Sequence, residues 1–348
     1  MRSAIVGLTL VALTIVLGLP ARAADGPRIY VSNEDSGEIT LVYPGTGQVL
    51  QRISVGKRPR GIKLAPGGKL LYVALSGSPN AGPGVDESKL PPPDRSADGI
   101  GVVDLATFKL LRTLPSGQDP EAFDLSPDGK TLFISNEETA EVTVLDIATA
   151  RVTRRVAVGR EPEGVTVRPD GKVVYVTCEG DDEVVAIDTA TFKVISHMHT
   201  ELRPRSVVFT KDGSTAFATA ERGAAVTVLD AVRHKAIETI NIPSEAGKAL
   251  PARPMGSVIA PDGRHIYVSN GRGESVAVID VATRKVTRMI DDVGTRPWGI
   301  GVSPDGRNIY TANGPSDDVS VIDVETGRVD RRIKVGGRPW GLVVAARP

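Results

Sequence analysis

The chain has 348 residues, with 42 Lys and Arg residues balanced by 42 Asp and Glu residues, and one cysteine, Cys178. The balance argues against binding nucleic acid or a membrane surface through bulk positive charge. A single cysteine excludes an intrachain disulfide and a thiolate cage for a metal, so we expect a fold that rests on a hydrophobic core.

Residues 1–23 are typical of a secretory signal peptide. Arg2 precedes an apolar run from Ala4 to Leu19, and Ala21 and Ala23 provide the small residues of a cleavage site. We expect cleavage after Ala23, a periplasmic or secreted protein, and no membrane span in the mature chain. An uncleaved anchor is the alternative, although the apolar run is short for one.

Residues 24–348 form a repeating sequence with a period of about 42 residues, which predicts a single domain. Each repeat holds four short runs in which apolar and polar residues alternate, with turn residues between them. The third run ends in aspartate at Asp104, Asp146, Asp188, Asp230, Asp280 and Asp323, and a seventh copy lies upstream, ending at Tyr43. Seven such repeats predict an all-β fold, a seven-bladed β-propeller of four-stranded antiparallel blades.

The two ends of the chain supply parts of one blade. RIYVSN (28–33) matches a second strand, and GLVVAA (341–346) matches a first strand after which the repeat stops. We therefore expect the C-terminal strand to pair with the N-terminal strands and close the ring without an unpaired edge. Two insertions, at about 76–98 and 244–251, should lie on one face, the first as an irregular flap.

Two recurring features are assigned to folding. An Asp-Gly pair occurs in the first hairpin of most repeats, where glycine supplies the left-handed conformation of a tight turn. The aspartates at the ends of the third strands can accept hydrogen bonds from their own turn. We therefore do not interpret the row of aspartates as a catalytic array.

The segments IYVSN, LFISN and IYTAN, followed by VTVLD, VAVID and VSVID, resemble the YVTN-type β-propeller repeats of exported prokaryotic proteins. The order GKRPRG, SGQDPEAF, GREPEG, LRPRS and GGRPWG is similar to propellers associated with pyrroloquinoline-quinone-dependent alcohol catabolism. Such propellers are usually inferred to be accessory periplasmic proteins. The resemblance therefore implies binding rather than catalysis, and it brings no catalytic residues.

The hexapeptides GTRPWG (294–299) and GGRPWG (336–341) mark the start of the innermost strand of a blade. Seven versions of this motif should surround one mouth of the central channel. Two neighbouring blades carry acids on both sides of the proline, and the other five carry arginine. The residues expected to bind a ligand are Arg58, Arg60, Arg203, Arg205, Arg253, Arg296, Arg338, Trp298, Trp340, Glu121 and Glu163.

These side chains admit two interpretations. Converging arginines suit an anion, because a planar guanidinium matches carboxylate geometry, but arginines and glutamates could instead pair between neighbouring blades. Trp298 and Trp340 either pack as wedges between blades or form a stacking platform for a planar or sugar ligand. A second group of acids should begin loops on the same face, as solvated glutamates or as part of a cation site: Glu34, Glu137, Glu179 and Glu221.

The sequence lacks several kinds of chemistry. It has no Cys-x-x-Cys-His motif for attached haem and only four histidines. His197 and His199 share one side of a strand, but this strand is the outermost of its blade, so we predict no metal site there. No cofactor and no catalytic residue is predicted.

The sequence favours a non-catalytic, monomeric periplasmic scaffold, and the resemblance implies that it is accessory to a quinoprotein or cytochrome-linked oxidation system. Its partner would be a quinoprotein dehydrogenase, a cytochrome or a small anionic ligand bound at the channel mouth. The first alternative is a propeller-type hydrolase or lyase such as a lactonase, using Glu121 and Glu163 with or without a divalent cation. The second is a cell-surface adhesion module that binds through the flat faces of its blades.

Overall fold

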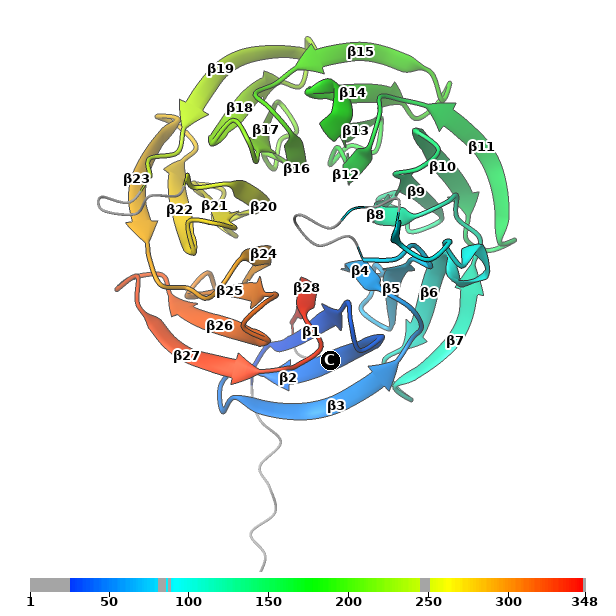
Figure 1. Ribbon diagram of the computed structural model, residues 1–348. Coiled ribbons are helices and arrows are strands. Elements are labelled where there is room, and N and C mark those ends of the chain that lie inside the picture. Colours follow the sequence, from blue (N-terminus) through cyan, green and yellow to red (C-terminus); the bar gives the residue numbers. More distant parts are fainter. Residues whose placement is uncertain (1–25, 81–85, 87–88, 245–250, 347–348) are drawn as a thin grey trace, which may run out of the picture.

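The computed structural model describes residues 26–80, 86, 89–244 and 251–346. The chain folds into seven sheets, each with four antiparallel strands. They are arranged in a ring (Figure 1). The prediction of an all-β, seven-bladed propeller is confirmed. The predicted signal peptide and most of the 244–251 insertion lie outside the described residues. Within the described part, no helix is long and apolar enough to cross a membrane.

In every sheet the strands follow one another from the innermost to the outermost. The first three sheets are β4 (Pro59–Leu64), β5 (Leu70–Leu75), β6 (Gly99–Asp104), β7 (Lys109–Leu114); β8 (Pro120–Leu125), β9 (Thr131–Asn136), β10 (Glu141–Asp146), β11 (Arg151–Ala157); and β12 (Pro162–Val167), β13 (Val173–Cys178), β14 (Glu183–Asp188), β15 (Val194–His199). The next three are β16 (Pro204–Phe209), β17 (Thr215–Ala220), β18 (Ala225–Asp230), β19 (Lys235–Asn241); β20 (Pro254–Ile259), β21 (His265–Asn270), β22 (Ser275–Asp280), β23 (Lys285–Ile290); and β24 (Pro297–Val302), β25 (Asn308–Asn313), β26 (Asp318–Asp323), β27 (Val329–Lys334). The last is β28 (Pro339–Ala345), β1 (Arg28–Asn33), β2 (Glu38–Tyr43), β3 (Gln48–Ser54). The described residues also contain the short 3₁₀ helices η2 (Arg95–Ala97) and η3 (Glu179–Asp181).

The last sheet closes the ring. Strand β28 pairs antiparallel with β1, with Ile29 opposite Val344 and Val31 opposite Leu342. The expected closure is confirmed, and Figure 1 shows the red C-terminal strand beside the blue N-terminal strands. The backbone of β1 is therefore paired on both sides, and the ring has no open seam.

The hydrophobic core lies between neighbouring sheets. Val144 of β10 belongs to the same buried cluster as Val165 of β12 and Val176 of β13, so it bridges two sheets. The rings of Tyr72 and Phe123 meet edge to face across another such boundary, with centroids 6.5 Å apart. Each buried aliphatic side chain of this kind contributes about 1.5–3 kcal/mol. The propeller is held together by this packing between sheets.

The recurring turn residues fold as the sequence predicts. Gly129 and Gly171 of the Asp-Gly pairs have φ angles of 69° and 73°, a left-handed conformation that glycine adopts without strain. Asp146 accepts a hydrogen bond from the backbone N–H of Thr149 at 2.8 Å, inside its own turn. The structural interpretation of these two motifs is confirmed.

Candidate functional site

Each innermost strand begins at the proline of the hexapeptide motif, and the residue before that proline is strained. Its φ angle is positive in all seven blades: Arg58 41°, Asp119 53°, Glu161 50°, Arg203 62°, Arg253 60°, Arg296 52° and Arg338 56°. This conformation costs a non-glycine residue about 1–2 kcal/mol. A residue before proline ordinarily favours extended backbone. This turn was therefore not predictable from the sequence.

In five of the seven blades, a backbone hydrogen bond ties the strained turn to the loop after the second strand. The first residue of that loop donates its N–H to the carbonyl of the residue before the proline. Four of these donors are the second group of glutamates: Glu34 to Arg338 at 3.0 Å, Glu137 to Asp119 at 3.1 Å, Glu179 to Glu161 at 3.0 Å and Glu221 to Arg203 at 2.8 Å. The bond therefore places these glutamates beside the arginines of the mouth.

The expectation of solvated loop glutamates is wrong for three of the four. Glu34, Glu179 and Glu221 are only 6 %, 6 % and 8 % exposed. The side chain of Glu137 is 36 % exposed. A buried carboxylate requires a partner, and the neighbouring arginines supply one. The repeat position of these residues was visible in the sequence, but their burial depends on the strained turn.

In five blades the residue after the proline is held from the preceding blade. A serine or threonine in the second strand of that blade donates its hydroxyl to the residue's carbonyl. The pairs are Ser32 with Arg60 at 2.6 Å, Ser135 with Glu163 at 2.6 Å, Thr177 with Arg205 at 3.1 Å, Thr219 with Met255 at 2.6 Å and Ser269 with Trp298 at 2.7 Å. These bonds fix the backbone under the variable side chains of the mouth.

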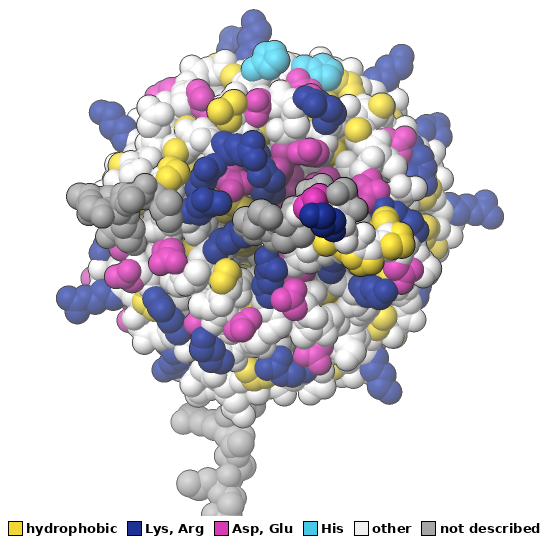
Figure 2. Space-filling view, in the orientation of Figure 1, with side chains coloured by type: hydrophobic (Ala, Val, Ile, Leu, Met, Phe, Trp, Pro, Cys, Tyr) yellow, Lys and Arg dark blue, Asp and Glu magenta, His cyan; other side chains and the backbone are white. Residues whose placement is uncertain are grey.

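A cavity of about 600 Å³, the mouth cavity, opens at this end of the channel. Figure 2 shows a group of basic side chains beside a group of acidic ones at the central hollow. Ten of the eleven predicted ligand-binding residues line it: Arg58, Arg60, Arg203, Arg205, Arg296, Arg338, Trp298, Trp340, Glu121 and Glu163. Arg253 does not. The first insertion also contributes, through Ser78–Asn80 and Leu90–Pro93, as its predicted position implies.

Arg60 lies at the centre of the acidic side of the mouth cavity. Its Nη1 atom contacts the carboxylate of Glu121 and lies 3.7 Å from that of Asp119 and 3.9 Å from that of Glu137. Its Nε atom lies 3.4 Å from Glu34. One buried guanidinium therefore offsets the charge of several carboxylates that come from different blades.

Arg205 is the centre of a second ion-pair network. It lies 3.0 Å from Glu163 and 2.8 Å from Glu221, and it contacts Glu179, which also pairs with Arg203 at 2.5 Å. Burial and then the neighbouring Glu163 carboxylate raise the pKa of Glu179 to about 9, although Arg205 and Arg203 act in the opposite direction. Pairing between blades is thus correct for the arginines of these two networks.

Glu137 differs from the buried carboxyls of the mouth cavity because its side chain is 36 % exposed. Burial raises the pKa of Glu137, Arg60 opposes this, and the carboxylate of Asp119 raises it further. A carboxyl group with a raised pKa at a cavity wall is suited to accept and return a proton during a reaction. The repeat pattern located Glu137 on this face but contained no sign of its raised pKa.

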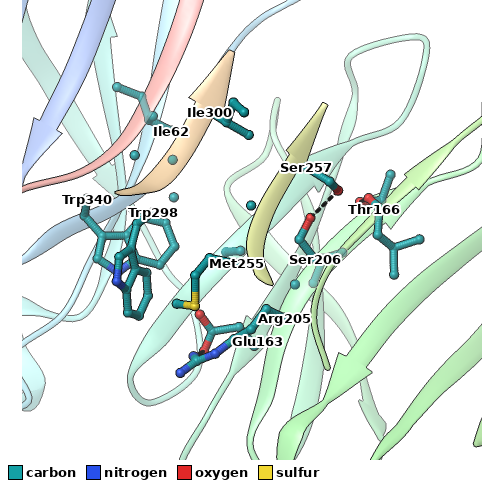
Figure 3. Close-up of a pocket in the computed structure, with 18 of the residues that line it drawn as sticks. Ile62, Glu163, Thr166, Arg205, Ser206, Met255, Ser257, Trp298, Ile300 and Trp340 are labelled. Carbon is teal, nitrogen blue, oxygen red and sulfur yellow. Dashed lines mark hydrogen bonds and ion pairs between the residues drawn. The ribbon is translucent and has the colours of Figure 1, made fainter. Parts of the chain in front are cut away.

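The two tryptophans form an aromatic wall. The ring centroids of Trp298 and Trp340 lie 5.3 Å apart at an angle of 48°, and the guanidinium of Arg205 lies 5.1 Å from the Trp298 centroid. Both rings also line a second cavity of about 230 Å³ along the channel, where Figure 3 shows them across from the hydrogen-bonded Ser206 and Ser257. Neither tryptophan is fully buried, so both present ring surface to a ligand.

One group of carboxylates could hold a divalent cation. Asp119, Glu121 and Glu137 each offer an oxygen within 4.8 Å of the others. The Nη1 atom of Arg60 lies within 4 Å of all three residues, so a guanidinium already supplies positive charge there. On the outermost strand β15, His197 instead forms a 2.9 Å contact with Glu183.

The ring of sheets and its polar mouth define a seven-bladed β-propeller with a ligand-sized cavity at one end of the channel. A family model described as "Lactonase, 7-bladed beta-propeller" matches residues 159–338, more than half of the chain. The chain therefore belongs to this lactonase family. A model described as a YNCE-like β-propeller matches residues 86–170. No protein of curated function matches the sequence significantly.

Solved structures agree on the fold. The periplasmic gluconolactonase of Pseudomonas aeruginosa has a TM-score of 0.74 at 21% identity, covering 92% of this chain and 99% of its own. A putative 6-phosphogluconolactonase of Bacteroides uniformis has a TM-score of 0.72 at 19% identity, and the match covers 92% of this chain and 100% of that protein. Hydrazine synthase of Kuenenia stuttgartiensis has a TM-score of 0.66 at 21% identity, and the match covers 81% of this chain and 88% of that chain. At these identities the likeness establishes the fold alone.

These findings correct the functional interpretation of the sequence. The non-catalytic scaffold is wrong, because the matching family model is one of lactonases. The comparisons support the lactonase alternative instead. They lend nothing to the narrower resemblance to propellers of pyrroloquinoline-quinone-dependent alcohol catabolism.

Proposed function

We propose that the protein hydrolyses a lactone in the mouth cavity, with Glu137 as the general base. Membership of the lactonase family supports the reaction. The observation that supports the site is the raised pKa of Glu137 at the wall of a cavity that also presents arginines and two tryptophans. These are the groups that ring opening needs: a base, positive charge for the oxyanion, and a surface for the substrate.

Hydrolysis requires one water and no further reactant. Glu137 takes a proton from the water while the water oxygen bonds to the lactone carbonyl carbon. The negative charge that develops on the carbonyl oxygen is stabilised by a guanidinium, and Arg60 lies closest to Glu137. The ring C–O bond then breaks, and the protonated Glu137 returns its proton to the leaving alkoxide. The product is a hydroxy acid, and Glu137 is again a carboxylate.

The aromatic wall favours a sugar lactone. The apolar face of a sugar ring packs well against indole, and polar groups around it can hydrogen-bond the hydroxyls. Two of the similar structures are described as a gluconolactonase and a putative 6-phosphogluconolactonase, which supports the same substrate class. A periplasmic location is part of this proposal. It is supported by the signal-like N-terminal sequence.

The test is turnover of D-glucono-1,5-lactone, followed by proton release with a pH indicator and corrected for spontaneous ring opening. The purified wild type should accelerate hydrolysis. Glu137→Gln should lower kcat by about 10²–10⁴-fold, because the amide cannot accept the proton. Glu325→Gln, in an exposed turn outside the mouth cavity, is the matched control and should retain full activity. An undiminished rate in Glu137→Gln would rule out this base.

A further inference from the structure

One side of the mouth cavity carries positive charge that the carboxylates of the described residues compensate only in part. Arg296 is half-buried, lines the cavity, and forms no ion pair with any described carboxylate. Arg338 has one, a 3.8 Å contact with Glu34. The same carboxylate already holds Arg58 at 2.9 Å. By contrast, Arg60 and Arg205 are each surrounded by several acids.

The surroundings of Arg296 add to this excess. Burial lowers the pKa of Arg296, and Arg338, Arg205 and Arg272 lower it further. Glu221 acts in the opposite direction. Its carboxylate, however, is bonded to Arg205 at 2.8 Å. Like charges gathered in a partly buried place are unfavourable until an anion joins them.

The place of this charge is favourable for a ligand. The guanidinium of Arg296 lies 5.5 Å from the ring centroid of Trp298, so it is held against the aromatic wall. The ring of Trp340 lies beside that of Trp298, and Trp340 follows Arg338 by two residues. A sugar ring packed on this wall would place a charged substituent next to both arginines.

We infer that Arg296 and Arg338, beside Trp298 and Trp340, form a subsite for an anionic substituent of the lactone, a carboxylate or a phosphate. The inference rests on the proposed lactone hydrolysis and names its substrate class. Guanidinium groups bind both kinds of oxyanion through paired N–H donors. Asp119 and Glu121, the acids beside Glu137, lie at the start of β8, which faces β24 across the channel (Figure 1). There they would repel the same substituent and so orient the substrate.

The kinetic test compares three lactones: neutral D-glucono-1,5-lactone, carboxylate-bearing D-glucaro-1,4-lactone and 6-phospho-D-glucono-1,5-lactone. Arg296→Ala and Arg338→Ala should raise the KM of an anionic lactone roughly ten- to a hundredfold, the value of a hydrogen bond to a charged group. The KM of the neutral lactone should change less than about twofold, since it makes no such bond. Arg296→Lys should restore part of the loss. Arg307→Ala, an exposed arginine in the turn between β24 and β25, is the charge-matched control.

Equal KM changes for neutral and anionic lactones would overturn the inference, while the hydrolysis itself would still stand. A binding experiment covers the opposite case, in which the protein binds the anion but does not hydrolyse the lactones. D-glucarate and inorganic phosphate are titrated by calorimetry into the wild type and Arg296→Ala, with melting temperatures as the check on folding. Binding that depends on Arg296 supports the subsite even in a protein that hydrolyses none of the three lactones. The probe that binds identifies carboxylate or phosphate, and binding of neither overturns the inference.

Discussion

The guanidinium of Arg205 lies 3.0 Å from the carboxylate of Glu163, and both side chains are almost fully buried. The pair joins two neighbouring blades and lines both the mouth cavity and the cavity of the channel. It therefore links the stability of the ring to the shape of the site.

Removing this arginine should destabilise the fold. Arg205→Leu leaves Glu163, Glu179 and Glu221 without their shared cation, and the loss of a partner in a buried ion pair costs about 3–5 kcal/mol. Urea unfolding at neutral pH measures the loss, with Arg307→Ala as the exposed control. A loss below about 1 kcal/mol, the value of a surface pair, would contradict this role.

Glu179 should make stability depend on pH. Its folded pKa of about 9 exceeds the unfolded value of about 4.3, so the folded state retains a proton that the unfolded chain has lost. The stabilisation is complete below about pH 4 and declines as the pH rises towards 9, by at most about 1.4 kcal/mol per pH unit. Glu179→Gln cannot ionise and should flatten this decline in unfolding curves from pH 5 to 9. If Glu179→Gln leaves the pH dependence of the unfolding free energy unchanged, another group holds the extra proton.

The raised pKa of Glu137 should govern the pH profile of hydrolysis. The base must be ionised, so kcat/KM should fall as the pH drops through a value above that of an ordinary glutamate. Asp119→Asn removes a negative neighbour that raises this pKa, and it should move the acidic limb to lower pH. An acidic limb that Asp119→Asn leaves in place would speak against Glu137 as the titrating group.

Chelation should leave the rate unchanged. The only group of described carboxylates with a geometry for a cation surrounds Arg60, which already supplies the positive charge. Hydrolysis after dialysis against EDTA should therefore equal that of untreated protein. Loss of activity that returns with added Ca²⁺ or Zn²⁺ would show that a metal displaces the guanidinium.

The tryptophans should determine substrate affinity. Trp298→Ala or Trp340→Ala should raise the KM for a sugar lactone about three- to tenfold with little change in kcat, as expected for lost ring packing. They are the only two tryptophans of the chain, so quenching of intrinsic fluorescence reports binding at this wall directly. A KM unaffected in both variants would leave them as packing residues.

Periodic patterning was enough to predict the seven blades and the closing strand, because each strand repeats at a fixed interval and no blade can bury its faces alone. It also located the mouth, since the variable residues flank a proline that recurs in every repeat. Pairing between arginines and glutamates could be foreseen as one alternative, but the particular partners could not: whether Glu34 or Glu179 is solvated depends on a left-handed turn that the rule for residues before proline does not suggest. The choice between scaffold and lactonase required the family comparison, because arginines, glutamates and tryptophans serve both.

The seven left-handed residues at the mouth have a consequence for engineering. Glycine would adopt these φ angles without strain, so each Arg, Asp or Glu there is kept at a cost of about 1–2 kcal/mol. Replacing them one at a time with glycine relaxes the backbone and deletes the side chain in the same step. Positions where the protein becomes more heat-resistant and less active would separate the residues held for chemistry from those held for architecture.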